Sequence, residues 1–337
     1  MTTGEEFLEY YFSWAGPAGR AYAAALGAQL PPAAGAAEQV LVCGMGGSGV
    51  AGDYAAAMAE DYGGAPVYVA KAPEPPAWVD GRTLVVAVSF SGNTRETLEC
   101  AARSLRRGAI VVAVTSGGKL SSWARRSGQP LLLVEEAPAP RAGLPQLFYT
   151  VLGLLEGLGL LHVPRWDVEE SIALLKRREE AEREARELAA WLQGARQPII
   201  VAAPEPYSAL AVRTRSELAE NAKMLGLEAV LPEAGHNLLE ALAAGGAYDL
   251  LLLDPGEEPW SRLLHEAAGL VRASSIHSLR MRGSTGLQRL IVGSQVVGAA
   301  TVMAAIGRGV DPVSLTAVKA FRRVVESSTE WGRGREY

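Results

Sequence analysis

The sequence predicts an α/β protein with two doubly wound domains, each a parallel sheet flanked by helices. Short apolar segments rich in Val, Leu and Ile alternate with helical segments along most of the chain. A strongly charged helical segment at about residues 168–192 interrupts this alternation, which then starts again. Such a rhythm is typical of parallel strands joined by crossover helices, with both faces of the sheet covered. We therefore predict one domain in residues 1–160 and a second in residues 161–337.

The length of the chain is consistent with two domains. Its charge and hydropathy argue against nucleic acid and membranes as partners. A chain of 337 residues suggests two domains, at roughly 150 residues per domain. With 32 basic and 37 acidic residues the net charge is −5, which argues against a nucleic-acid surface. The polar start at Met1–Glu6 does not resemble a signal peptide, and no uninterrupted apolar stretch reaches a membrane-spanning length. We predict a cytoplasmic protein without a membrane partner, in which Cys43 and Cys100 are buried free thiols.

The first half is expected to contain a helical segment over residues 5–30, followed by five strands. These strands are predicted at residues 39–43, 66–69, 85–88, 109–114 and 131–134. Helices are predicted over residues 50–62, from Thr94 to about Arg107, and over residues 145–159. The strands are short and apolar, as expected for strands buried on both faces.

The second half repeats the pattern after the charged helix, whose alternating Glu and Arg residues indicate a solvated face with i,i+4 ion pairs. Strands are predicted at residues 198–203, 228–231, 248–253 and 274–279, and helices over residues 208–224 and 287–306. Asp311-Pro312 is expected to start the last helix, with Asp at the N-cap and Pro at N1. Residues 331–337 are expected to be loosely held. The two halves resemble a duplicated unit without a residue-level repeat.

A cluster of hydroxyl side chains follows the third predicted strand. Ser89, Ser91 and Thr94 lie where this strand ends and a helix begins. Parallel sheets bind ligands at such strand ends, and the unpaired N–H groups of a helix start favour an anion. The alternative is that Ser91 or Thr94 only caps the helix. Three hydroxyls within six residues favour a phosphate-binding loop.

A glycine-rich loop follows the first predicted strand and has two interpretations. Gly44-Met45-Gly46-Gly47-Ser48-Gly49 matches the dinucleotide fingerprint G-x-G-x-x-G. That fingerprint also requires an acid near the end of the second strand, but Lys71 stands there and the next acid is Glu74. Together with the hydroxyl cluster on a neighbouring strand, the loop favours a phosphorylated sugar over a dinucleotide.

The two loops together resemble the sugar isomerase (SIS) domain, and the chain as a whole resembles the bifunctional phosphoglucose/phosphomannose isomerases. Further marks of the resemblance, in the family's order, are Pro140-Arg141-Ala142, Glu217 to Lys223, Pro232 to Asn237, and Lys319. The resemblance extends from the first strand to the last helix and implies two SIS-type domains. Two departures are Gly235, where we expect Asn, and Gly143-Leu144-Pro145, where we expect a Leu-Gly step.

The resemblance implies an aldose–ketose isomerase acting on hexose 6-phosphates through a cis-enediol. Glu220 would be the base, Arg141 the enediolate stabiliser, and His236 and Lys319 the ring-opening and hydroxyl-handling groups. The implied phosphate-binding residues are Gly47, Ser48, Ser89, Ser91 and Thr94. The resemblance implies no metal and no cofactor. It also implies a homodimer whose active site lies near the interface, with His236 the residue expected to cross over.

Each of the four catalytic candidates has an ordinary structural explanation when taken alone. Glu220 fits a solvated helix face, His236 a surface loop, Arg141 an exposed Pro-rich loop, and Lys319 a plain helix surface. Two other functions therefore remain as alternatives. A non-catalytic phosphosugar-binding protein would need only the hydroxyl cluster, and an NAD(P)-dependent oxidoreductase would use the glycine-rich loop.

Overall fold

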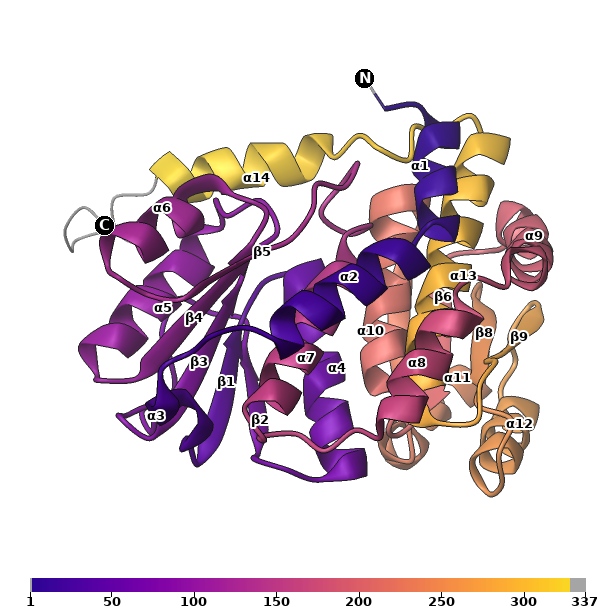
Figure 1. Ribbon diagram of the computed structural model, residues 1–337. Helices are drawn as coiled ribbons and strands as arrows, with labels where there is room; N and C mark the ends of the chain where they lie inside the picture. The colour runs from indigo at the N-terminus through magenta and orange to yellow at the C-terminus, as the bar shows by residue number, and fades with distance from the viewer. Residues whose placement is uncertain (1, 328–337) are drawn as a thin grey trace.

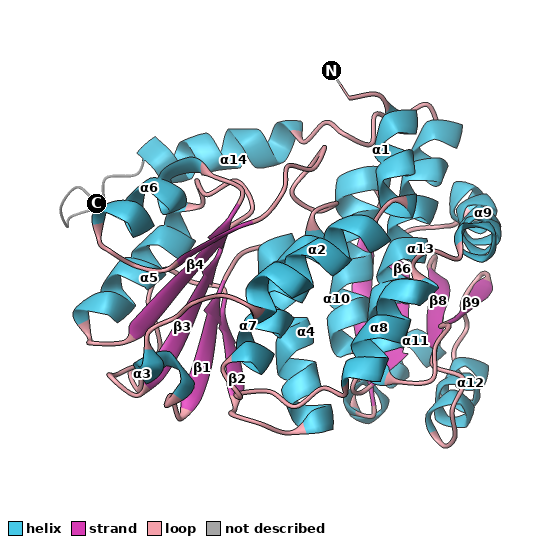
Figure 2. Ribbon diagram, viewed as in Figure 1, coloured by secondary structure: helices cyan, strands magenta, loops and turns pink. Residues whose placement is uncertain are grey.

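The computed structural model describes residues 2–327 and contains two parallel sheets, each with helices on both faces (Figures 1 and 2). The predicted fold class is therefore confirmed. The first sheet has the strand order β2-β1-β3-β4-β5. Its strands are β1 (Gln39–Cys43), β2 (Val67–Ala70), β3 (Thr83–Val88), β4 (Ile110–Thr115) and β5 (Leu131–Leu133).

The second sheet has the strand order β7-β6-β8-β9, and all its neighbouring strands are parallel. Its strands are β6 (Ile199–Pro204), β7 (Gly226–Leu231), β8 (Asp249–Asp254) and β9 (Ile276–Arg280). In chain order, β6, β7, β8 and β9 take the places that β1, β2, β3 and β4 take in the first sheet. The two halves thus share one topology.

Side chains of the first sheet alternate between two helical layers, as the two-residue period of a strand requires. Leu41 and Val85 pack with the layer of α5 and α6, whereas Val42 and Val86 pack with the layer of α4 and α7. The helices of this half are α2 (Ala15–Leu26), α3 (Pro32–Gly35), α4 (Gly47–Tyr62), α5 (Arg95–Arg106), α6 (Gly118–Arg126) and α7 (Leu144–Gly157). Both faces of the sheet are buried, which explains its continuous apolar strands.

The longest helix of the second half, α13 (Gly286–Gly307), lies in the core. It is long and apolar enough to cross a membrane, but 83% of its most apolar window is buried inside the fold. The other helices of this half are α8 (Arg165–Leu174), α9 (Arg178–Gly194), α10 (Ser208–Glu217), α11 (Leu238–Ala244), α12 (Trp260–Leu270) and α14 (Thr316–Ser327). α13 is therefore a packing helix of the core.

The N-terminal helix α1 (Gly4–Phe12) packs on α13, far from it in sequence (Figure 1). Phe7 and Tyr11 of α1 are fully buried. A Cβ atom on Gly298 of α13 would lie 2.0 Å from Cε1 of Tyr11, so only glycine leaves room for this ring. The start of the chain thereby reaches the core of the second half.

Two predicted helical segments each form two helices, and a third helix begins later than predicted. The segment 5–30 forms α1 and α2, and the charged segment 168–192 forms α8 and α9. The charged segment is interrupted between α8 and α9 at Leu175, which is buried and whose carbonyl accepts a hydrogen bond from Gln295 at 3.2 Å. The last helix begins at Thr316, because Asp311 accepts from the N–H of Val313 at 2.8 Å and forms a local turn instead of a helix cap. Residues 331–337 lie outside the described part of the chain.

The prediction of two free thiols is wrong, because Cys43 and Cys100 form a disulfide. Cys43 ends β1 and Cys100 lies on α5, and both side chains belong to the same buried layer on one face of the first sheet. The sequence pattern placed each residue in the core but contained no information on their contact. The bond joins the two elements that precede and follow the predicted phosphate-binding loops.

Candidate active site

The hydroxyl cluster lies at the carboxyl end of β3, where α5 begins. Ser89 is 1% exposed, and its Oγ donates to Oγ1 of Thr94 at 3.1 Å. Thr94 is the residue before α5, but within the described residues its hydroxyl does not bond to the helix backbone. Ser91 Oγ accepts from the N–H of Asn93 at 3.3 Å. The simple capping interpretation therefore does not describe Thr94, and the hydroxyl cluster lies next to the first N–H groups of α5.

The glycine-rich loop joins this cluster from the neighbouring strand. It follows β1, and α4 begins at Gly47 after Gly46 with a φ of 54°. Ser48 Oγ accepts from the N–H of Phe90 at 3.2 Å, so the two loops are bonded to each other. After β2, Lys71 pairs with Asp53 at 2.6 Å. A cation thus occupies the strand end where the dinucleotide fingerprint requires an acid for the ribose.

The turn containing Arg141 packs against both loops. A Cβ atom on Gly47 would lie 3.4 Å from Cα of Arg141. A Cβ atom on Gly143 would lie 2.4 Å from Cε2 of Phe90. Gly143, noted above as a departure from the family pattern, therefore makes close contact with the hydroxyl loop possible. The backbone of residues 140–143 and the two loops form one continuous wall.

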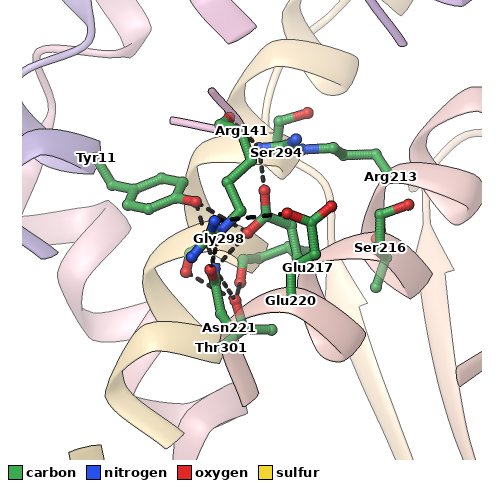
Figure 3. A network of polar contacts seen from close by, with 12 residues as sticks. Tyr11, Arg141, Arg213, Ser216, Glu217, Glu220, Asn221, Ser294, Gly298 and Thr301 are labelled. Carbon is green, nitrogen blue, oxygen red and sulfur yellow. Dashed lines mark hydrogen bonds and ion pairs between the residues drawn. The ribbon is translucent and has the colours of Figure 1, made fainter. Parts of the chain in front are cut away.

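Arg141 meets Glu220 at this wall (Figure 3). Nη1 of Arg141 lies 3.5 Å from Oε2 of Glu220. Arg141 is 3% exposed, contrary to the ordinary expectation for a Pro-rich loop, whereas the Glu220 side chain is 29% exposed. The Arg141 guanidinium also lies over the ring of Phe7, 4.9 Å from its centroid, in a cation–π contact. The pair thus combines a fixed cation with a carboxylate that solvent can reach.

A π-helical turn positions Glu220. The predicted helix 208–224 is regular only to Glu217 and continues as a π-turn over Leu218–Ala222, which Lys223 ends with a φ of 54°. The Lys223 ammonium donates to the carbonyl of Glu220 at 2.5 Å and to that of Ser314 at 2.7 Å. Burial and the nearby Arg141 lower the pKa of Lys223. π-turns occur frequently at functional sites.

His236 and Lys319 lie apart from the Arg141–Glu220 pair. His236 ends a 3-10 turn (Glu233–His236) that follows β7, whereas Glu220 precedes β7. The six residues of β7 span about 20 Å. Lys319 is exposed on α14, which runs across the first half toward α6 (Figure 1). Neither side chain bonds to Arg141 or Glu220 among the residues that the structure describes.

The structure also shows a group of buried polar residues for which the sequence pattern predicts no role. Its members are Tyr11, Arg213, Glu217, Asn221 and Thr301 (Figure 3). Asn221 Oδ1 accepts from Nε of Arg141 at 2.5 Å, and Arg213 donates to the carbonyl of Arg141 at 2.7 Å. Glu217 and Asn221 flank Glu220 in the same motif. Their closeness to Glu220 in the sequence is the signal from which their place in this group could have been inferred. In the described part of the chain, no group of three His, Cys, Asp or Glu residues could hold a metal.

Comparisons with known protein families match both halves of the chain. The SIS domain family model matches residues 36–151. The model described as "Bacterial phospho-glucose isomerase C-terminal SIS domain" matches residues 181–325. Each match contains one of the two sheets, and the two follow each other in the order that the sequence predicts.

Two relatives and one solved structure extend these matches. The bifunctional phosphoglucose/phosphomannose isomerase of Aeropyrum pernix is 32% identical over 336 residues, covering 94% of this chain and 96% of the relative. The enzyme of the same name from Thermoplasma acidophilum is 27% identical over 288 residues, covering 84% and 88%. The C-terminal domain of glucosamine-fructose-6-phosphate aminotransferase from Francisella tularensis shares the fold, with a TM-score of 0.68 at 15% identity and coverage of 90% and 97%.

Proposed function

Because this chain belongs to the bifunctional phosphoglucose/phosphomannose isomerase family, we propose that it interconverts fructose 6-phosphate with glucose 6-phosphate and with mannose 6-phosphate. The observation that carries this proposal is the Arg141–Glu220 contact of 3.5 Å beside Gly47 of the glycine-rich loop. It combines a carboxylate base, a fixed cation and a loop suited to phosphate in one wall. Phosphate would be held by the hydroxyls of Ser89, Ser91 and Thr94 and by the N–H groups at the helix starts.

The proposed reaction transfers protons within the sugar. From the open-chain aldose, the Glu220 carboxylate removes the proton from C2, a C1–C2 double bond forms, and the C1 carbonyl oxygen becomes an enediolate oxygen. The proton of the O2 hydroxyl then passes to O1, and Glu220 returns the proton it took to C1 as the C2 carbonyl forms. The Arg141 guanidinium donates hydrogen bonds to the oxygen that becomes negative between these steps. Carbon, hydrogen and electrons balance within the substrate, and we propose no cofactor.

We propose that the active unit is a homodimer and that His236 of one subunit serves the site of the other. Support comes from β7, whose six residues lie between Glu220 and His236 in one chain and span about 20 Å. Both His236 and Lys319 are exposed, as groups that meet a second subunit or an entering substrate would be. Phe321, on the same helix as Lys319, is 64% exposed and offers apolar surface for such a contact. We assign His236 and Lys319 to opening the sugar ring and moving its hydroxyl protons.

The first test is a coupled assay with fructose 6-phosphate that follows glucose 6-phosphate and mannose 6-phosphate separately. Glu220→Gln is expected to lower kcat about 1,000-fold, because general base catalysis is lost, while binding of fructose 6-phosphate is retained. Glu228→Gln is the matched control, since Glu228 also pairs with an arginine and is 32% exposed, against 29% for Glu220. Binding without turnover by the unmodified protein would favour the non-catalytic phosphosugar-binding alternative.

Subunit mixing tests the shared site. Glu220→Gln and His236→Gln chains are each expected to be inactive, and dissociation and reassociation of a mixture should restore about a quarter of the wild-type activity. Half of the dimers would then be hybrids, with one intact and one doubly altered site. If Glu220 and His236 acted from the same chain, no mixture would contain an intact site and no activity would return.

We propose the cytoplasm as the compartment, on the basis of the substrate class. Phosphorylated hexoses are charged metabolites that remain inside the cell. The Cys43–Cys100 disulfide removes the support that two free thiols would have provided, since most disulfides form in oxidising compartments.

A further inference from the structure

We propose that Glu217 is a positioning residue of this site, holding Arg141 through Asn221 and Arg213 in the orientation that Glu220 and the substrate require. This inference rests on the proposed function and adds to it a residue to which the family resemblance assigned no role. Glu217 is 0% exposed, so it does not reach substrate and acts only through its neighbours. Figure 3 shows its carboxylate pointing into the polar group behind Arg141.

The first connection runs through the amide of Asn221. Its Oδ1 accepts from Nε of Arg141 at 2.5 Å, which requires its NH₂ group to point the other way. There the NH₂ group donates to Oε2 of Glu217 and, at 3.0 Å, to Oγ1 of Thr301. A carboxylate is an acceptor only, so Glu217 favours one orientation of the amide and thereby aims its oxygen at Arg141.

The second connection runs through Arg213, which is 1% exposed. Its Nη2 forms an ion pair with Oε1 of Glu217 and donates to the main-chain carbonyl of Arg141 at 2.7 Å. A buried guanidinium requires a compensating charge, and Glu217 provides it. Glu217 is therefore linked to the side chain of Arg141 through Asn221 and to the backbone of Arg141 through Arg213.

Two further features hold Glu217 itself. Its Oε2 accepts from the hydroxyl of Tyr11 at 2.9 Å, and Tyr11 comes from α1, outside both segments matched by the family models. The change from α10 to a π-turn after Glu217 places Asn221 beside it and leaves Glu220 on the accessible side. One short segment thus provides both the exposed base and the buried anchor of its partner arginine.

The test measures kcat and KM of Glu217→Gln in the coupled assay. We expect kcat to fall about 10- to 100-fold, since misplacing a catalytic group by an ångström has effects of this size. KM for fructose 6-phosphate should stay within about threefold of wild type, because no hydrogen bond or ion pair joins Glu217 to the described residues of the two loops. Glu217→Asp keeps the charge and is expected to recover part of the lost kcat. A fall in the folded fraction alone, with normal kcat per folded molecule, would overturn the proposal.

Tyr11→Phe keeps the inference testable if Glu217→Gln does not fold. It removes one hydrogen bond to Glu217 and should lower kcat about threefold. The control is Tyr54→Phe, which removes an equally buried hydroxyl bonded to Ser294 at 2.6 Å and should leave kcat unchanged. Equal kcat values for the two variants and wild type would contradict the proposal.

A double-mutant cycle separates this inference from the proposed function. If Glu217 acts through Arg141, Glu217→Gln should cost less than about twofold in an Arg141→Lys background. Full additivity would overturn the positioning role while leaving the isomerase assignment intact. An inactive wild-type protein in the same assay would instead overturn the proposed function, and the positioning role with it.

Discussion

The carboxyl ends of β3 and β8 occupy equivalent places in the two sheets but carry opposite chemistry. After β3 the chain presents the neutral hydroxyls of the predicted phosphate loop, next to a helix start. At the end of β8 it presents the carboxylates of Asp254, the last residue of the strand, and Glu257, which pair with Arg280 at 3.4 Å and Arg289 at 2.6 Å. The edge at β3 offers hydrogen-bond donors to an anion. At the edge at β8, Arg280 and Arg289 are already paired with carboxylates of the protein.

The pKa of Asp254 shows that its carboxylate is stabilised by neighbouring groups at the second edge. Burial alone would raise this pKa, but the hydroxyl of Ser261, the N–H of Gly256 and the nearby His265 and Arg280 together hold it below its usual value. A cavity of about 480 Å³ opens here, lined in part by Arg280 and Arg289. Because carboxylates neutralise these arginines, we propose phosphate binding at the first edge alone. A duplicated fold thus does not imply a duplicated site.

Removing hydroxyls from each edge is expected to give the largest difference between them. The double variant Ser89→Ala, Thr94→Val should raise KM for fructose 6-phosphate about 100-fold, since each hydrogen bond to a charged group contributes about 1.5 kcal/mol. Ser261→Ala is the matched change at the second edge, where this hydroxyl donates to Asp254 at 2.7 Å. It should leave KM unchanged. A similar rise in KM for both variants would place phosphate at both edges.

The fold could be predicted because its strands are buried on both faces. The predicted strand at residues 39–43 coincides with β1 (Gln39–Cys43), and the same apolar continuity located the other strands to within about two residues. The two loops that we propose to bind phosphate could also be located, because the hydroxyls and glycines of each are adjacent in sequence and follow neighbouring strands. The spacing of residues in the sequence is sufficient to locate a group of functional residues when all of them lie in one short segment.

The surroundings of Arg141 could not be predicted, because they come from distant segments. Phe7, Asn221 and Pro312 contact its guanidinium from three separate segments of the chain, and nothing in its own Pro-rich loop indicates burial. The π-turn after Glu217 and the Cys43–Cys100 disulfide likewise depend on packing across elements. The sequence indicated a role for Arg141 only through its resemblance to a known family, and it did not indicate which residues contact Arg141.

The smaller predicted difference concerns two glycines with positive φ, one after each of the strands β3 and β8. Gly92 follows β3 with a φ of 65°, and Gly256 follows β8 with a φ of 70°. A Cβ atom on Gly92 would lie 1.8 Å from the backbone oxygen of Gly117, and one on Gly256 would lie 1.8 Å from Cζ of the Arg280 side chain. Backbone must move in the first case, whereas an exposed side chain can swing away in the second.

Alanine at Gly256 should therefore lower stability by about 1 kcal/mol through backbone strain, and alanine at Gly92 by about 3 kcal/mol. Thermal unfolding of the two variants measures the difference. Gly92→Ala should also raise KM, because the displaced backbone belongs to the phosphate loop, while Gly256→Ala should not. Equal losses of stability with equal KM would mean that the loop after β3 adapts as easily as the Arg280 side chain at the end of β9. The phosphate loop would then be ordered by its ligand instead of by the close contact between Gly92 and Gly117.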